Sequence, residues 1–467
     1  MCLGANNHPD RFTTPECYNA QYQSPPGKNW ATGPNSSEVD AGGIMADLTW
    51  NFGSELSLKS ISAYRKIDGR SERDLDSTPI PIWDDYIDFD QQQFSQEFQL
   101  SGSALSRRLN WLVGAFYMRE KGDSLDLVPT FFITLKSGGS VDNDTYAVFT
   151  QLNYDLNEKI SLSLGARYME ETKRYTPDQE YVESGVALLP NVEAEIDTEE
   201  FNPSASIQYH LNDSVTAYLS YSQGVKGGGF TQRISSPIVP APGQNPADVI
   251  PTFDPEEAKS YEIGVKSELF NRRVRLNAAI FQTDYTDKQI NILPPNSFAP
   301  TVRNAGDVEF WGAELELEAI ASDWLRLNGG VGYLDHEYTY VNPNATAIDR
   351  NSKLPNAPKY TANLGFTADL FSLQDLRFSL RADASYKSRM YKDAPNSQSL
   401  KQDGYTLLNL SLLMTSSDEA WFASAGVTNL TDEDYIISGI VSGGGGYASA
   451  TMSRGAEWFL RVGYHFR

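Results

Sequence analysis

The sequence predicts an all-β fold, a transmembrane antiparallel meander β-barrel with about 17 strands. Three observations support this prediction: apolar and polar residues alternate along many segments, aromatic residues close the apolar faces, and very short turns alternate with long polar connections. No apolar run reaches about 18 residues, so no transmembrane helix is expected. Barrel strands cross a membrane in about ten residues and never build such a run.

The alternation has a period of two, as a strand requires. In residues 160–169, Ile160, Leu162 and Leu164 point to one face while Ser161 and Ser163 point to the other. The same period recurs in residues 261–269, 311–319, 376–387 and 458–466. We expect the apolar set to face lipid, including Leu162, Leu164, Leu315, Leu317, Phe378, Leu380, Leu460 and Val462.

The connections between the predicted strands come in two lengths. Short turns are predicted at residues 51–54, 157–159, 212–213, 271–272 and 322–324. Long polar segments alternate with them, at residues 68–90, 121–143, 176–198, 226–257, 287–306, 337–356, 391–402 and 434–455. This asymmetry is typical of outer-membrane barrels, with short periplasmic turns and long outer loops. A propeller would show a four-strand period, which is not seen here.

Counting back from the C-terminus sets the expected domain limits. The first strand, near residues 42–52, would run toward the periplasm, so residues 1–40 would be the remnant of an extracellular loop and residues 41–467 the barrel. Bacterial single-chain barrels have even strand numbers. An odd count therefore predicts a barrel that is incomplete at its N-terminus.

Composition excludes several classes of function. A formal charge of −23 disfavours nucleic acid as a partner. Two cysteines and four scattered histidines are too few for a disulfide scaffold or a zinc centre, and no cofactor or metal is expected. One hypothesis is that Cys2 and Cys17 form a disulfide in the oxidising periplasm during assembly. A lipid-modified Cys2 is disfavoured, because no lipobox precedes it.

Several stretches resemble TonB-dependent outer-membrane receptors. They are Ser220–Phe230 (SYSQGVKGGGF), Lys259–Lys266 with the hairpin that follows it, and Val427–Tyr435 (VTNLTDEDY). The resemblance runs from about residue 42 to residue 466 and implies a 22-stranded barrel around a plug domain. About five strands, the plug and the TonB box would then lie outside this chain. A further departure from the family is Arg467, which follows the usual terminal aromatic.

The resemblance also implies a function and a set of partners. It implies a protein of the cell outer membrane that takes up a scarce chelate, most often a ferric siderophore. Its partners would be the TonB complex, outer-membrane lipid and the barrel assembly machinery. Cobalamin or a saccharide is the alternative cargo within the family, and a passive outer-membrane pore is the alternative outside it.

The charges expected on the polar face favour a lumen over an active site. Arg167, Glu262, Glu314, Glu316, Arg381 and Arg461 are predicted to line the lumen. An enzyme would need a nucleophile beside a base, and the histidines lie on distant strands. Gly227–Gly229 lacks the Lys-Ser/Thr of a P-loop. Acidic clusters such as Asp84–Asp90 are predicted to be solvated loops rather than calcium sites.

The predicted ligand contacts lie near the outer rim. Residues 226–232 and 443–447 are expected to be mobile and to close over the ligand, because glycine allows many backbone conformations. Aromatic and basic side chains would contact the chelate. The candidates are Arg174, Lys226, Phe230, Arg233, Tyr338, Tyr340, Arg389, Tyr391 and Tyr447.

Overall fold

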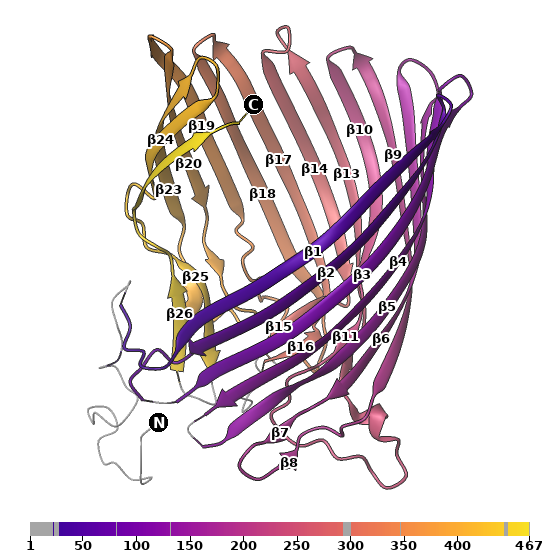
Figure 1. The fold of residues 1–467 in the computed structure, drawn as a ribbon, viewed down its shortest axis with the longest axis vertical. Helices are drawn as coiled ribbons and strands as arrows, with labels where there is room; N and C mark the ends of the chain where they lie inside the picture. The colour runs from indigo at the N-terminus through magenta and orange to yellow at the C-terminus, as the bar shows by residue number, and fades with distance from the viewer. Residues whose placement is uncertain are drawn as a thin grey trace.

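A computed structural model describes Tyr22 and residues 28–80, 82–130, 132–292, 300–345, 347–442 and 447–466. Seventeen long strands and two short ones form one curved antiparallel sheet, in which each long strand pairs with its neighbours in sequence (Figure 1). The long strands are β1 Asn35–Phe52, β2 Leu56–Asp74, β3 Asp84–Ala104, β4 Leu109–Pro129, β5 Thr134–Asp155, β6 Ile160–Pro177, β9 Ala194–Asn212, β10 Val215–Lys226, β13 Glu256–Leu269, β14 Val274–Thr286, β17 Gly306–Ser322, β18 Leu325–Val341, β19 Tyr360–Leu373, β20 Leu376–Lys387, β23 Tyr405–Ser416, β24 Trp421–Thr428 and β27 Glu457–Tyr464. The predicted meander is confirmed.

The sheet ends at β1 on one side and at β27 on the other. In the part of the chain that the structure describes, β1 pairs with β2 and β27 pairs with β24, and no pairing joins β1 to β27. β1 begins at Asn35 rather than near residue 42, because its register with β2 continues without a break to the pair Asn35↔Arg73. Residues 35–40, expected to belong to a loop, are therefore strand.

Short turns gather at one rim of the sheet and long connections at the other (Figure 1). The five predicted short turns are confirmed as connections of two to four residues. The long connections carry small strands and 3-10 turns of their own: β7 Glu180–Tyr181, β8 Val186–Ala187, β11 Gly229–Phe230, η2 Pro246–Val249, β12 Thr252–Phe253, β15 Gln289–Ile292, β16 Thr301–Asn304, β21 Met390–Tyr391, η3 Gln398–Leu400, β22 Lys401–Gln402, β25 Ile436–Ser442 and β26 Tyr447–Met452. Among the described residues, no helix is long and apolar enough to cross a bilayer.

Two of the segments predicted as long loops are mostly strand. Residues 68–90 are loop only between Asp74 and Asp84, and residues 121–143 only between Pro129 and Thr134. The sequence predicts loops in these two segments because the alternation of apolar and polar residues stops there. The ladders continue past the membrane because charged side chains pair across them, as Arg119 does with Asp142 through two hydrogen bonds of 3.1 and 2.9 Å.

The register separates an apolar face from a polar face. The eight residues predicted to face lipid all lie on the apolar face, and none belongs to the buried core. Leu164 is 52% exposed and Leu460 is 75% exposed. A soluble barrel would bury such residues, so the exposure agrees with a lipid-facing surface.

A row of aromatic side chains limits the apolar face on the side of the long connections. Neighbouring rings lie close together, with centroids 4.9 Å apart for Tyr117 and Tyr146 and 5.1 Å apart for Tyr221 and Tyr261. This row is the girdle expected where a barrel leaves the hydrocarbon layer. Its described members are Tyr64, Phe94, Tyr117, Tyr146, Tyr168, Phe201, Tyr221, Tyr261, Trp311, Tyr333, Tyr360 and Tyr386.

Buried apolar clusters lie at the long-connection rim. One centres on Ile292, Val308 and Leu354, the second on Ile82 and Leu188, and a third on Tyr175, Leu189 and Ile250. Each joins strand ends to the connections that follow them. The loops are thus fastened to the wall by burial of apolar surface.

Candidate functional site

The glycine-rich segment after β10 lies against the wall of the sheet. Gly229 and Phe230 pair with Thr252–Phe253 of β12. A Cβ on Gly229 would lie 2.6 Å from the Phe253 ring. Phe230 packs on Tyr175 of β6, with ring centroids 5.5 Å apart. Close packing therefore explains this glycine, where the sequence had suggested a mobile loop.

Two side chains hold the carbonyl groups of the same segment. The Lys173 ammonium donates to Gly228 O at 2.8 Å, and the Gln289 amide donates to Gly227 O at 3.0 Å. Lys173 also pairs with Glu171 at 2.8 Å. Sequence reasoning missed Lys173 and Gln289, because nothing in a sequence marks a polar side chain whose partner is a backbone carbonyl on a distant connection.

Arg233 belongs to a charge network rather than standing free. Its guanidinium lies 2.5 Å from Asp126 of β4, and Arg73 of β2 pairs with Asp85 of β3. Both carboxyl groups are more than nine-tenths buried. Asp126 lies nine residues beyond the girdle tyrosine of its strand, outside the membrane-spanning part, and burial together with the Asp85 carboxyl raises its pKa to about 7. The network ties the long connection after β11 to three wall strands.

Tyr338 is covered, contrary to the expectation that it contacts ligand. It is 3% exposed and packs in one cluster with Ala345 and Leu354 of the connection that follows β18. Its neighbour His336 accepts a hydrogen bond from Leu354 N at 3.0 Å through Nε2, which fastens the same connection. Tyr340, two residues further on, is 48% exposed. Of the two tyrosines, only Tyr340 is open to a ligand in this conformation.

The other rim candidates differ in how free they are. Arg389 is exposed and lies 3.2 Å from Asp403, and Tyr391 accepts a weak hydrogen bond from Gln398 at 3.5 Å. Tyr447 begins β26, but its side chain is outside the described residues. Residues 443–446 and both cysteines also lie outside them.

Lys226 and Arg174 lie on opposite faces of the sheet. Lys226 ends β10 on the polar face and is exposed. Arg174 lies on the apolar face beyond the girdle, where it pairs with Asp144 at 3.1 Å and Glu195 at 2.7 Å. Arg174 therefore points away from the polar face and is not a ligand contact on it. The expectation that Arg174 faces inward is therefore wrong, and its contact with a ligand stays a prediction.

The six charged residues expected in the lumen all lie on the polar face by register. Their contacts are local. Arg167 lies over the rings of Phe116 and Phe149, at 5.4 and 5.7 Å from their centroids. The Glu262 carboxylate accepts a hydrogen bond from the Tyr218 hydroxyl at 2.5 Å, and the Glu316 carboxylate accepts one from the Asn277 amide at 3.5 Å. The Arg381 guanidinium lies 3.6 Å from the Asp383 carboxylate, and that of Arg461 lies over the Phe459 ring. Glu314 is exposed.

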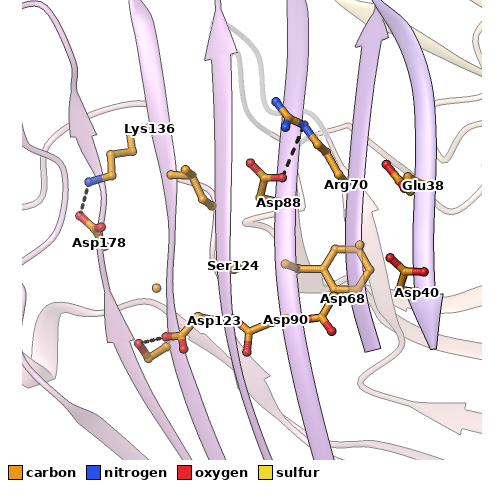
Figure 2. A pocket seen from close by; sticks show the side chains of 15 residues that line it. Glu38, Asp40, Asp68, Arg70, Asp88, Asp90, Asp123, Ser124, Lys136 and Asp178 are labelled. Atoms are coloured by element: carbon orange, nitrogen blue, oxygen red, sulfur yellow. Dashed lines mark hydrogen bonds and ion pairs between the residues drawn. The ribbon is translucent and has the colours of Figure 1, made fainter. Parts of the chain in front are cut away.

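An acidic cavity of about 720 Å³ lies over β1–β5, beyond the girdle. Asp40, Asp68, Asp90 and Asp123 are successive cross-strand partners and form a row over four strands (Figure 2). Like charges in directly opposite positions repel. Among the described residues, no group of three or more His, Cys, Asp or Glu side chains has a geometry that could hold a metal ion.

Comparison with known proteins places this architecture in a family. The family model described as TonB dependent receptor-like, beta-barrel, matches residues 3–430. The chain is 25% identical over 285 residues to the probable TonB-dependent siderophore receptor PiuA of Acinetobacter baumannii, covering 59% of this chain and 34% of that protein. It is 24% identical over 296 residues to the ferrioxamine B receptor of Salmonella typhimurium, covering 62% of this chain and 37% of that protein.

Solved structures agree on the fold. The ferric yersiniabactin uptake receptor FyuA of Yersinia pestis superposes with a TM-score of 0.79 at 18% identity, covering 93% of this chain and 63% of that one. The siderophore receptor PiuA of Acinetobacter baumannii gives a TM-score of 0.71 at 20% identity, covering 92% and 64%.

The chain belongs to the TonB-dependent receptor β-barrel family. It is thus a protein of the Gram-negative outer membrane, in a family of receptors and transporters rather than enzymes. The chain spans about a third of the length of the curated relatives it matches.

Proposed function

We propose that this barrel serves the uptake of a ferric siderophore. The observation that carries the proposal is the set of relatives, which are named as siderophore receptors, a ferrioxamine B receptor and a metal-pseudopaline receptor. The last of these favours a second candidate, a chelate of another metal. Uptake would be driven through the TonB complex, as the family name implies.

The arrangement of the long-connection rim supports this proposal. The connections are fastened in place, so a chelate would meet surfaces that are already formed and would pay little ordering entropy. Lys226 and Arg389 offer positive charge for chelate oxygens, and Tyr340 offers an exposed ring. These three residues are our first candidates for contact with the ligand.

Growth on a panel of ferric siderophores tests the proposal. A strain with the full-length gene is compared with its deletion under iron limitation, and the deletion is complemented with wild type, Lys226→Ala or Tyr340→Ala. We expect the deletion to lose growth on one chelate and the variants to restore it only partly. Unchanged growth on every ferric chelate, with a lost response to cobalamin, an oligosaccharide or another metal chelate, would contradict the assignment to iron.

A further inference from the structure

An apolar groove opens on the lipid-facing side of the sheet, over β3–β6. Its volume is about 500 Å³, and it lies just inside the aromatic girdle. One cross-strand row makes its floor and side walls: Phe98 pairs with Ala115, Ala115 with Val148, and Val148 with Tyr168. The groove is therefore built by four neighbouring strands and not by a loop.

The sizes of these four side chains create the groove. Ala115 and Val148 are small and form the floor, while the rings of Phe98 and Tyr168 stand on either side. Tyr117 and Tyr146, with ring centroids 4.9 Å apart, line the end toward the long connections. Val148 is 58% exposed at the centre. Such an apolar channel fits a hydrocarbon chain and gives a polar ligand no partner along its floor.

Carboxylates lie around the end of the groove nearest the long connections, which is its mouth. The Tyr168 hydroxyl lies 3.0 Å from a carboxylate oxygen of Glu170 and 3.0 Å from one of Glu199, and it shares its one proton between them. The Tyr117 hydroxyl donates at 3.0 Å to Asp144, which also pairs with Arg174. The Tyr117 and Tyr168 hydroxyls are thus engaged, and Glu170 at the mouth of the groove is exposed. A carboxylate accepts hydrogen bonds and attracts a cation. Arg174 already pairs with Asp144, whereas Glu170 and Glu199 form no ion pair in the part of the chain that the structure describes. These two carboxylates favour a head group that carries a positive donor.

We propose that this groove binds one acyl chain of a membrane lipid whose head group carries an ammonium. The groove is continuous with the apolar face that contacts lipid, so the bilayer supplies the acyl chain. Its acidic mouth matches the ammonium and repels a purely anionic head group. The bound lipid would cover Phe98 and Val148 and would hold β3–β6 together at the membrane boundary. This inference does not depend on the identity of the transported ligand.

Native mass spectrometry of the full-length protein tests the inference. The protein is reconstituted with equal amounts of phosphatidylethanolamine and phosphatidylglycerol, released, and the retained lipids are counted. Ala115→Trp fills the floor of the groove, and Ala278→Trp is the matched control, an exposed alanine on the same face in β14. We expect Ala115→Trp to lower retained phosphatidylethanolamine about tenfold, which corresponds to about 1.4 kcal/mol, and the control to leave it unchanged.

Further variants separate binding of the acyl chain from recognition of the head group. Val148→Trp should act as Ala115→Trp does and serves if the latter does not fold. Glu170→Gln should lower the preference for phosphatidylethanolamine over phosphatidylglycerol. Equal retention in the groove variants and the control would overturn the site. Equal retention of both lipids by wild type, or preferred retention of unmodified lipid A when it is offered, would overturn the ammonium assignment.

Discussion

The Tyr117 hydroxyl donates to Asp144 Oδ1 at 3.0 Å, from β4 to its neighbour β5, at the edge of the lipid-facing surface nearest the long connections. The contact is one of a series. Other girdle tyrosines donate to acceptors in the next row toward the long connections: Tyr64 to Gln92, Tyr168 to Glu199, Tyr221 to Gln223 and Tyr333 to Asp335. On this one face of the sheet, the rings lie toward the hydrocarbon layer and their acceptors lie toward water, so the row marks where the hydrocarbon layer ends.

This boundary predicts a difference between two adjacent residues of β17. Leu317 lies on the lipid-facing side, about midway between the girdle residue Trp311 and the turn residue Trp324, and Glu316 lies on the polar face. Leu317→Arg should destabilise the folded protein by about 2 to 4 kcal/mol, because a charge enters the bilayer. Glu316→Arg should cost much less. Urea unfolding of the full-length protein in lipid vesicles measures both, and equal costs would contradict the assignment of the faces.

The close packing around Gly228 predicts that one added methyl group destabilises residues 226–232. A Cβ there would lie 2.7 Å from Phe253 O, so Gly228→Ala should destabilise the segment by about 1 to 3 kcal/mol. Gly224→Ala is the control, since a Cβ there has nothing within 4 Å. Hydrogen exchange of residues 226–232 should quicken in the first variant only. If both variants behave like wild type, the segment is not packed as described.

Glu256 is the anchor of the connection that follows β14. Its carboxylate, 5% exposed, lies 2.6 Å from the Lys288 ammonium and accepts from Gln289 N at 2.7 Å. Glu256→Ala should cost about 3 to 5 kcal/mol locally, because a mostly buried ammonium loses its partner. Hydrogen exchange of β15 and β16 should rise accordingly. Glu257→Ala, which changes the neighbouring residue on the opposite face, should leave the exchange there unchanged, and a rise in both variants would show a general loosening instead.

Asp126 predicts a dependence of stability on pH. The pKa of this carboxyl is raised from 3.8 to about 7, chiefly by burial and against the lowering effect of Arg233. Between these values the folded state binds a proton that the unfolded state lacks, so stability should fall as pH rises through this window. Asp126→Asn should flatten that dependence. Urea midpoints at pH 5 and pH 8 measure it, with the exposed Asp123→Asn as control; an unchanged slope in Asp126→Asn would contradict the role of Asp126.

Most of the fold could be predicted from the sequence because the two faces of a membrane strand meet different solvents. The period of two in Leu376–Lys387 therefore gives the exact bounds of β20. The alternation stops at the membrane boundary, because beyond it both faces of a strand meet water. Strand ends such as Asp68–Asp74 consequently resembled a loop, although they continue the ladder of β2.

The site was less predictable, because its geometry depends on contacts between distant connections. Tyr338 and Arg233 have the residue types expected of ligand contacts, but one is covered by the connection after β18 and the other is paired with Asp126. The glycines of residues 227–229 suggested mobility, although Phe253 and Lys173 hold them in place. Only the register and the packing of the loops distinguish these cases.

Uptake of radioactive iron tests the central claim most directly. Cells that carry the full-length gene are supplied with the ferric siderophore selected in the growth panel, in TonB-positive and TonB-negative backgrounds, and cell-associated iron is followed over time. The account predicts saturable accumulation that needs both the receptor and TonB. Equal accumulation without TonB would contradict it, because iron would then enter through a passive pore.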